Sequence, residues 1–373
     1  MTATVRSALA VAVGARVPVL LWGGPGLGKT SAVREMAAAA DLPCETVIAS
    51  IREPSDFAGL PVVGDDGRTV HFSPPRWAQR LSDAGRGVLF LDEISTAPPA
   101  VQAALLRVVL ERTVGDLQLP AEVTVVAAAN PPEQAADGWD LSPPLANRFC
   151  HLDWVLEPAE WSAGILGGFV PQAVPDLDDE ALRRGMTAAR GSIGAFVNTR
   201  PGLFHAPPAD ETAAGRAWPS PRAWDMAARL LAAADLAGAT DTVAAFLAAG
   251  AVGPAAALEF LAWRNELELP DAEEVLRDPS SFRLPDRGDR AYAALTALTA
   301  AVLADNTTDR WQAAWQAIAA GTDGGHADIA VAAVRSLLNH RPDGATPPRG
   351  VLVSMAPVLR AAGLFERLTA GSD

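Results

Sequence analysis

Lysine is almost absent from this sequence. Among 373 residues there is one lysine, Lys29, and every other long basic side chain is arginine. The composition has moved away from lysine wherever arginine serves. A position that keeps lysine is therefore predicted to need the compact ammonium group of lysine instead of the planar guanidinium group of arginine.

Cysteine and long apolar runs are also scarce. The two cysteines, Cys44 and Cys150, exclude a disulfide framework, and no C-x-x-C spacing exists to hold zinc. This usage fits a reducing cytoplasm. No apolar run reaches the ~18 residues of a membrane span. We expect the apolar start, residues 1–16, to form a short helix packed on the domain that begins at Val17, and not a signal peptide.

Positive charge is in short supply. The chain has 30 basic and 44 acidic residues, which gives a formal charge of −14. Such a surface repels phosphate backbones, so the charge disfavours nucleic acid as a partner. Hydrophobic residues make up 49% and charged residues 20%, so the chain can bury a sizeable core in two or three domains.

The single lysine lies in a glycine-rich segment, residues 23–30, that matches the pattern G-x-x-x-x-G-K-[ST]. An apolar run over 17–22 predicts a buried strand before it, and an alanine-rich stretch over 31–40 predicts a helix after it. Backbone N–H groups of such a loop wrap a polyphosphate, its lysine reaches the β- and γ-phosphates, and its Ser/Thr hydroxyl holds Mg²⁺. The predicted nucleotide-binding residues are Gly23, Gly24, Pro25, Gly26, Leu27, Gly28, Lys29, Thr30 and Ser31.

A second apolar run, residues 87–91, ends in the carboxylates Asp92 and Glu93. A buried parallel strand that ends this way places both side chains at the edge of the sheet where ligands bind. Asp92 is predicted to support Mg²⁺, and Glu93 to polarise the attacking water as a general base. A third buried strand, residues 123–129, ends at Asn130, whose amide could orient that water.

These motifs restrict the reaction class. Small GTPases read guanine with Asn-Lys-x-Asp, and a chain without a second lysine cannot contain that motif. P-loop kinases of small molecules do not usually carry the Asp-Glu strand end. Hydrolysis of ATP by a P-loop ATPase remains.

The order of these motifs resembles that of an AAA+ ATPase, and the wording narrows it to the MoxR branch of the AAA_5 type, which carries a helix-2 insert. Residues 90–106 read FLDEISTAPPAVQAALL, which is similar to the MoxR phrase LDEINRAPPKVQSALL, and residues 145–149 and 220–223 resemble the arginine-finger and sensor-2 segments. The resemblance covers about residues 17–240. Ser95-Thr96 and Asn147 depart from the usual Asn-Arg and Asp.

The resemblance implies roles for two arginines. Arg148 would be an arginine finger that completes the neighbouring subunit's site, and Arg222 would come from a lid helix and contact the γ-phosphate. Arg216 is a rival for the sensor role. Hairpins are expected over 60–72 and 112–119, the places of the helix-2 insert and of a second hairpin on the pore side of the ring.

The expected fold is an α/β P-loop AAA+ core, a three-layer αβα sandwich with a parallel five-stranded sheet, followed by an all-helical lid and a helical C-terminal extension. The expected domains are the core at 1–155, a transition with Pro and Gly punctuation at 156–208, the lid at 209–285 and the extension at 286–373. Helices are expected from Ser220 onward and near 240–249, 253–264, 290–304, 309–319, 326–338 and 350–361.

The resemblance implies a cytoplasmic ATPase that uses ATP and Mg²⁺, assembles as a ring, predicted to be a hexamer, and remodels, activates or loads metal or cofactor into a partner protein. MoxR-like ATPases are often paired with von Willebrand factor A (VWA) domain proteins, so such a partner is implied. Two alternatives stay open: a nucleic-acid-directed motor or restriction-type subunit, and a scaffold that binds ATP without hydrolysis.

Overall fold

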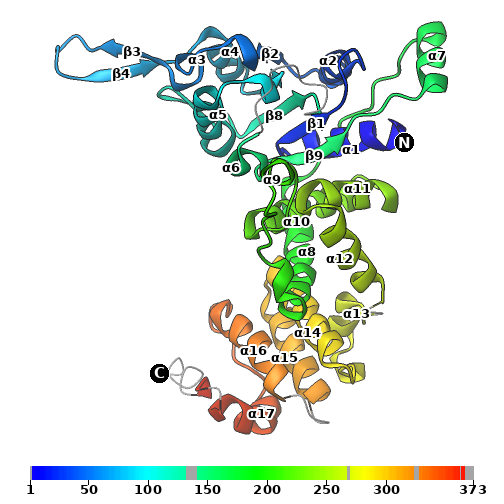
Figure 1. Cartoon of the computed structure of the whole chain (residues 1–373). Coiled ribbons are helices and arrows are strands. Elements are labelled where there is room, and N and C mark those ends of the chain that lie inside the picture. Colours follow the sequence, from blue (N-terminus) through cyan, green and yellow to red (C-terminus); the bar gives the residue numbers. More distant parts are fainter. Residues whose placement is uncertain (1, 132–140, 267–268, 323–326, 362, 366–373) are drawn as a thin grey trace. The chain divides into compact units, whose positions relative to one another are not determined.

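The computed structural model describes residues 2–131, 141–266, 269–322, 327–361 and 363–365. The chain divides into two compact units (Figure 1). Unit 1 comprises Met1–Asp178 and Leu203–Leu258, and unit 2 comprises Asp179–Gly202 and Glu259–Asp373.

Unit 1 is built on a five-stranded sheet with the strand order β2-β5-β8-β1-β9, in which every neighbouring pair is parallel. The three strands predicted from apolar runs are β1 (Val19–Trp22), β5 (Arg86–Asp92) and β8 (Glu122–Ala129). They fill the centre of the sheet because their side chains are buried on both faces. The edge strands are β2 (Cys44–Ile48) and β9 (Cys150–Asp153).

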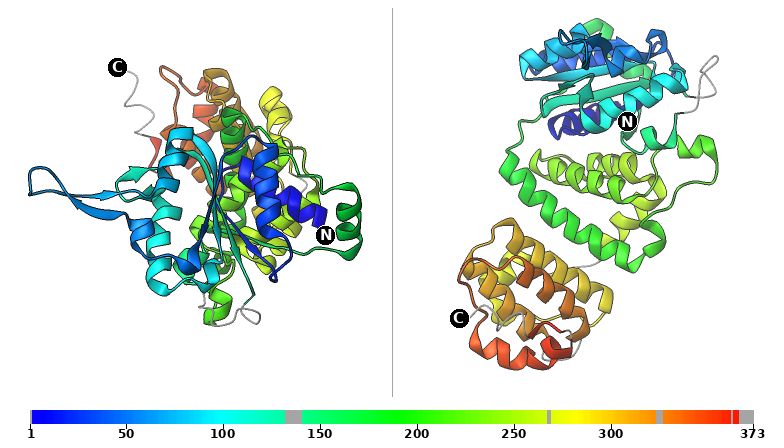
Figure 2. Two further views of the ribbon diagram at one scale, coloured as in Figure 1. Left: turned by 90° about the horizontal axis from the view of Figure 1, so that it is seen from above. Right: turned by 90° about the vertical axis from the view of Figure 1, so that its left-hand side faces the viewer.

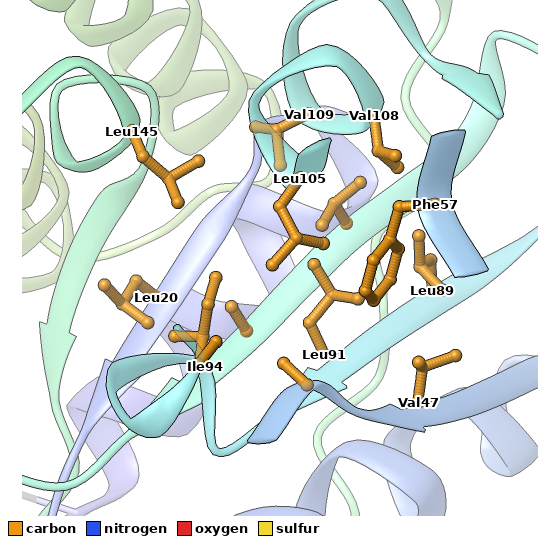
Figure 3. Packing of buried hydrophobic residues seen from close by; sticks show 14 of the residues in the cluster. Leu20, Val47, Phe57, Leu89, Leu91, Ile94, Leu105, Val108, Val109 and Leu145 are labelled. Atoms are coloured by element: carbon orange, nitrogen blue, oxygen red, sulfur yellow. The ribbon is translucent and has the colours of Figure 1, made fainter. Parts of the chain in front are cut away.

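Helices cover both faces of this sheet, which confirms the predicted three-layer α/β core. Alternate residues of β1 separate the layers: Leu20 and Trp22 join a cluster with Phe57, Leu81 and Leu105. Figure 3 shows part of this cluster, which packs α3 (Ser55–Ala58), α4 (Arg76–Ala84) and α5 (Pro99–Glu111) on the sheet. The opposite face carries α1 (Thr2–Gly14) and α2 (Lys29–Ala39), and α1 confirms the expected N-terminal helix.

Both predicted hairpins are confirmed. β3 (Leu60–Val63) pairs antiparallel with β4 (Val70–Ser73), and β6 (Thr113–Val114) with β7 (Leu117–Gln118). The backbone N–H of Phe72 donates to a carboxylate oxygen of Asp116 at 2.7 Å, and the N–H of Asp116 donates to the carbonyl oxygen of Phe72 at 3.0 Å. The two hairpins are therefore joined at their base, and β3–β4 projects from the sheet (Figure 2).

Every described element after β9 is helical, as predicted for the lid and the extension. The helices predicted from Ser220 onward are found to within a few residues, although the predicted start at His326 lies outside the described residues. The structure adds one short helix that was not predicted, α13 (Ala272–Arg277). None of the described helices is both long and apolar enough to cross a membrane. Unit 2 has its own core around Trp311 and Trp315. Helix α6 (Pro143–Ala146) lies just before β9. The α-helices after β9 are α7 (Pro158–Gly167), α8 (Asp179–Thr199), α9 (Glu211–Ala214), α10 (Pro221–Leu236), α11 (Asp241–Val252), α12 (Pro254–Glu266), α13 (Ala272–Arg277), α14 (Gly288–Ala304), α15 (Thr308–Thr322), α16 (Ala327–Asn339) and α17 (Arg349–Ala361). Short 3-10 helices lie at η1 (Ala49–Ile51), η2 (Ile94–Thr96), η4 (Pro201–Leu203) and η5 (Pro279–Ser281).

The segment expected as a transition with Pro and Gly punctuation, 156–208, contains a long helix. Three of its glycines, Gly185, Gly191 and Gly194, lie inside α8, a continuous helix of 21 residues. Gly191 serves close packing: a Cβ there would lie 3.1 Å from the Cβ of Ala300 and 3.4 Å from the carbonyl oxygen of Thr296, both on α14. The missing side chain lets two helix backbones approach, so tertiary contact outweighs the low helix propensity of glycine.

Candidate functional site

The glycine-rich segment forms a loop between β1 and α2 at the carboxyl edge of the sheet. Gly26 and Gly28 have φ angles of 80° and 77°, in the left-handed region. An added Cβ at either position would have open space around it, so glycine is needed for backbone conformation and not for room. The loop geometry leads directly into the N-terminus of α2 at Lys29, where backbone N–H groups are free for an anion.

Lys29 points back over the loop from the first turn of α2. Its Nζ donates to the carbonyl oxygens of Gly23 and Gly24, the latter at 3.0 Å, and to Oδ1 of Asn130 at 3.1 Å. Burial lowers the pKa of the Lys29 ammonium, and the nearby Asp92 carboxylate opposes that shift. The loop carbonyls and Asn130 thus hold the ammonium at the place where a polyphosphate would contact it.

The two carboxylates at the end of β5 have different partners. Oδ2 of Asp92 accepts a hydrogen bond from the Thr30 hydroxyl at 2.8 Å, so the loop and the acidic strand meet directly. The Glu93 carboxylate instead accepts one from the Ser50 hydroxyl at 2.6 Å. Glu93 has a φ of 56°, an uncommon value for a residue with a side chain. Ser50 follows β2 and gave no signal in the sequence.

Asn130 lies at the end of β8, beside the loop, and its backbone N–H donates to the Ser95 hydroxyl at 3.3 Å. The structure therefore brings three motifs, far apart in the chain, to one edge of the sheet. They line a cavity of about 390 Å³. Its lining residues are Pro25, Gly26, Leu27, Gly28, Lys29, Thr30, Ser31, Asp92, Glu93, Ala128, Ala129 and Asn130.

The donor set beside this cavity fits Mg²⁺. The Thr30 hydroxyl and the Asp92 carboxylate supply hard oxygen ligands within hydrogen-bonding distance of each other. Mg²⁺ characteristically takes one or two protein oxygens and completes its shell with phosphate oxygens and water. Thr30 and Asp92 would hold the ion, and a bound ion would neutralise charge on the phosphates.

Arg148 and Arg222 line a different cavity, of about 470 Å³. Burial, and then the positive charge of Arg222, lower the pKa of the Arg148 guanidinium, so the two cations lie near each other. We call this space the arginine cavity; its lining residues are Arg16, Val17, Pro18, Val109, Leu110, Arg112, Ala121, Arg148, Arg222, Asp225, Met226 and Arg229. Neighbouring like charges of this kind favour an anionic ligand.

The arginine cavity and the loop cavity lie at opposite edges of the sheet. The N–H of Cys150, two residues after Arg148, donates to the carbonyl oxygen of Pro18 at the start of β1. The phosphate loop begins at the other end of this strand, after Trp22. Four residues of extended strand separate the two ends by roughly 13 Å. Neither Arg148 nor Arg222 is among the described residues that line the loop cavity.

Asn147 and Ser220 join the two segments that carry the arginines. The buried Ser220 hydroxyl donates to Oδ1 of Asn147 at 2.6 Å and accepts from the N–H of Ala223 at 3.1 Å, as the N-cap of α10. Asn147 precedes Arg148 directly, and Ser220 lies two residues before Arg222. One buried bond therefore ties the strand entry that carries Arg148 to the helix start that carries Arg222.

Arg216, the rival for the sensor role, lies elsewhere. Its guanidinium stacks over the Trp22 ring at 4.1 Å and pairs with Asp153 at 2.9 Å. Behind it, the buried His151 accepts from the Trp22 indole N–H at 2.8 Å and contacts the carbonyl oxygen of Ala146 at 2.8 Å. Arg216 therefore anchors the end of β9 beside β1, at the carboxyl edge.

Comparison with known proteins identifies relatives of the part of the chain that carries this site. Residues 18–149 match the family model of the AAA domain (dynein-related subfamily). The MoxR protein of Methylorubrum extorquens is 36% identical over 107 residues, which are 28% of this chain and 30% of that protein. The chain contains a MoxR-like AAA+ domain. The match to MoxR spans less than a third of that protein's length, and the AAA+ domain match ends just before β9.

Among solved structures, a "putative ATPase" from Cytophaga hutchinsonii ATCC 33406 is similar with a TM-score of 0.41 and 18% identity. The similarity covers 65% of this chain and 79% of that one. The segment that matches the AAA domain model, residues 18–149, contains the loop, the Asp92-Glu93 strand end and Asn130, and it ends one residue after Arg148.

Proposed function

We propose that this AAA+ protein hydrolyses ATP at the loop cavity. The observation that carries the proposal is the convergence of Lys29, Thr30, Asp92, Glu93 and Asn130 at one edge of the sheet. Phosphate oxygens would replace the carbonyl and amide partners that Lys29 has now. Thr30 and Asp92 would hold Mg²⁺, Glu93 would accept the proton of the attacking water, and Asn130 would orient that water.

Arg148 and Arg222 supply positive charge to a second copy of the chain in this proposal. Both lie at the amino edge, across the sheet from their own phosphate loop. A head-to-tail contact sets the amino edge of one copy against the carboxyl edge of the next, and such contacts close into rings. The family resemblance suggests six copies. The expectation that Arg222 contacts the γ-phosphate then applies to the neighbour's nucleotide, together with Arg148.

Complementation between two inactive variants tests this shared site. Lys29→Ala and Arg148→Ala proteins should each lose turnover, by at least about 10³-fold for the arginine if it acts as an arginine finger. In an equal mixture, one interface in four pairs an intact Lys29 with an intact Arg148, so turnover should recover to roughly a quarter of wild type. No recovery, with rings still formed, would place both residues in the same copy's site.

The output of hydrolysis in this proposal is the remodelling, activation or cofactor loading of a partner protein with a VWA-type domain, in the cytoplasm. The resemblance to the MoxR branch supports it. The β3–β4 hairpin also supports it, because Leu60, Val63 and Phe72 are exposed there. The base of this hairpin contacts β6–β7, which lies between α5 and β8 in the chain, so it connects to the strand that carries Asn130.

A trapped complex tests the partner. Glu93→Gln should bind ATP without hydrolysing it and hold the assembled state. Capture from the native cytoplasm, with Lys29→Ala as the control that cannot bind ATP, should recover one protein with a VWA-type domain. Recovery of nucleic acid would instead favour the motor, and the absence of turnover in wild-type rings would favour the ATP-dependent scaffold.

A further inference from the structure

Helix α7 is exposed on nearly all sides. It leaves the carboxyl end of β9 and extends away from the sheet (Figures 1 and 2). Gly164 is its one buried residue, whereas Trp161, Ile165 and Leu166 are 49%, 56% and 87% exposed. A helix with three large apolar side chains in solvent marks an interaction surface. We call α7 and the chain around it, residues 155–178, the α7 arm.

The α7 arm is anchored beside the phosphate loop. Glu160 pairs with Arg6 at 3.3 Å, and the Arg6 guanidinium lies over the Trp154 ring at 5.6 Å. The Trp154 indole N–H in turn donates to the carbonyl oxygen of Leu27, in the loop itself, at 3.0 Å. This chain of contacts places the base of α7 next to the nucleotide site, on the same edge of the sheet.

The returning chain holds α7 in a defined position. A Cβ at Gly164 would lie 2.2 Å from the ring of Phe169, so that ring packs on the helix backbone. The Arg6 guanidinium lies 5.8 Å from the same ring. The exposed apolar residues therefore belong to a formed surface and are available without refolding of the arm.

Charge indicates which surface this arm fits. Residues 155–178 contain no Lys, Arg or His, but contain Glu157, Glu160, Asp176 and Asp178. The arginine cavity carries five arginines against one acidic residue, Asp225, and Arg16 among the five pairs with Glu122 at 2.6 Å. Its apolar rim includes Leu110, which is 49% exposed. An acidic, apolar arm and a basic, apolar cavity complement each other. They lie at opposite edges of the sheet, so they can meet in a head-to-tail pair.

We propose that the α7 arm of one copy packs on the rim of the arginine cavity of the next copy, with its apolar residues against Leu110. This contact lies just outside the nucleotide site of the first copy, and Arg148 and Arg222 of the next copy enter that site. This inference rests on the head-to-tail arrangement in the proposed function and adds the surface that holds it together. The partner that covers the exposed face of α7 is thus a second copy of this chain.

A charge on the arm tests the contact. Leu166→Glu in the full chain should keep ATP binding and thermal stability, because Leu166 is 87% exposed. It should raise the protein concentration at which rings form with ATP by about tenfold or more, because a carboxylate would replace the apolar side chain that the proposed contact buries. Turnover should fall in parallel at low protein concentration. Leu258→Glu is the matched control, since Leu258 is also on a helix and 72% exposed.

Cross-linking identifies the surface in contact. In a Cys44→Ser background, Leu166→Cys and Leu110→Cys chains, trapped with ATP by Glu93→Gln, should form a disulfide or a short bis-maleimide link only when mixed. A link between two Leu166→Cys chains would overturn the inference in favour of a symmetric contact, as would wild-type assembly of Leu166→Glu. Failure of the wild-type chain to form rings at all would instead overturn the shared site itself.

Discussion

The Ser220 hydroxyl donates to the Asn147 side-chain oxygen at 2.6 Å, in a position closed to solvent. The bond spans 73 residues and lies next to both arginines of the arginine cavity. Asn147 also donates to the carbonyl oxygen of Trp218 at 3.0 Å, so its amide is bound on both sides. An uncharged pair thus joins the two segments that carry the cations.

Removal of this bond should impair catalysis more than nucleotide binding. Ser220→Ala should lower kcat about tenfold, because Arg148 and Arg222 lose their common anchor, with ATP affinity unchanged within about twofold. Steady-state turnover and titration with a fluorescent nucleotide measure the two effects. Thr240→Ala is a matched control, because Thr240 caps α11 in the same way and costs a similar ~1 kcal/mol of helix stability. Equal loss of kcat in both variants would contradict the anchoring role.

Ser50 is expected to position Glu93 for water activation. Ser50→Ala removes the 2.6 Å hydrogen bond, frees the carboxylate to adopt other rotamers, and should lower kcat roughly threefold to tenfold without a change in KM. Ser50→Thr keeps the hydroxyl and should restore most of the activity. If Ser50→Ala turns over faster than wild type, the bond holds Glu93 away from the water instead.

Unit 1 should lose stability on mild acidification because of His151. Burial lowers the pKa of this histidine to about 4, so the folded protein keeps the ring neutral while the unfolded chain binds a proton at a higher pH. The contribution of the neutral His151 ring to the free energy of unfolding is fully present above about pH 6.5 and is lost as the pH falls toward 4. This contribution amounts to at most about 3 kcal/mol. Denaturant unfolding at several pH values measures it, and His151→Gln should flatten the profile in this window.

Two glycines of α8 should respond in opposite ways to alanine. A Cβ at Gly194 has open space, so Gly194→Ala should stabilise unit 2 by about 0.5–1 kcal/mol through helix propensity. At Gly191 the new Cβ would lie 3.1 Å from that of Ala300, so Gly191→Ala should be less stable than Gly194→Ala by about 1–2 kcal/mol. Thermal unfolding compares them. Equal gains at both sites would show that α14 yields to the added methyl group.

The sequence by itself determined the parts of the site that are local. The phosphate loop, the Asp92-Glu93 strand end and Asn130 each lie within a few residues of a buried strand, and parallel strands bring their carboxyl ends together. The central strands were visible because residues buried on both faces give continuous apolar runs. The edge strands β2 and β9 contain Glu45, His151 and Asp153 and gave no such run.

Only the tertiary structure decided which residues support that site. Ser50 on Glu93, and Asn147 on Ser220, are contacts between distant segments through common polar side chains, and no spacing in the chain marks them. The resemblance already assigned Arg148 to a neighbouring subunit's site, and the structure adds that Arg222 lines the same cavity at the amino edge of the sheet. Local periodicity fixes strands and loops, whereas side-chain partners depend on how distant elements pack, which no short pattern encodes.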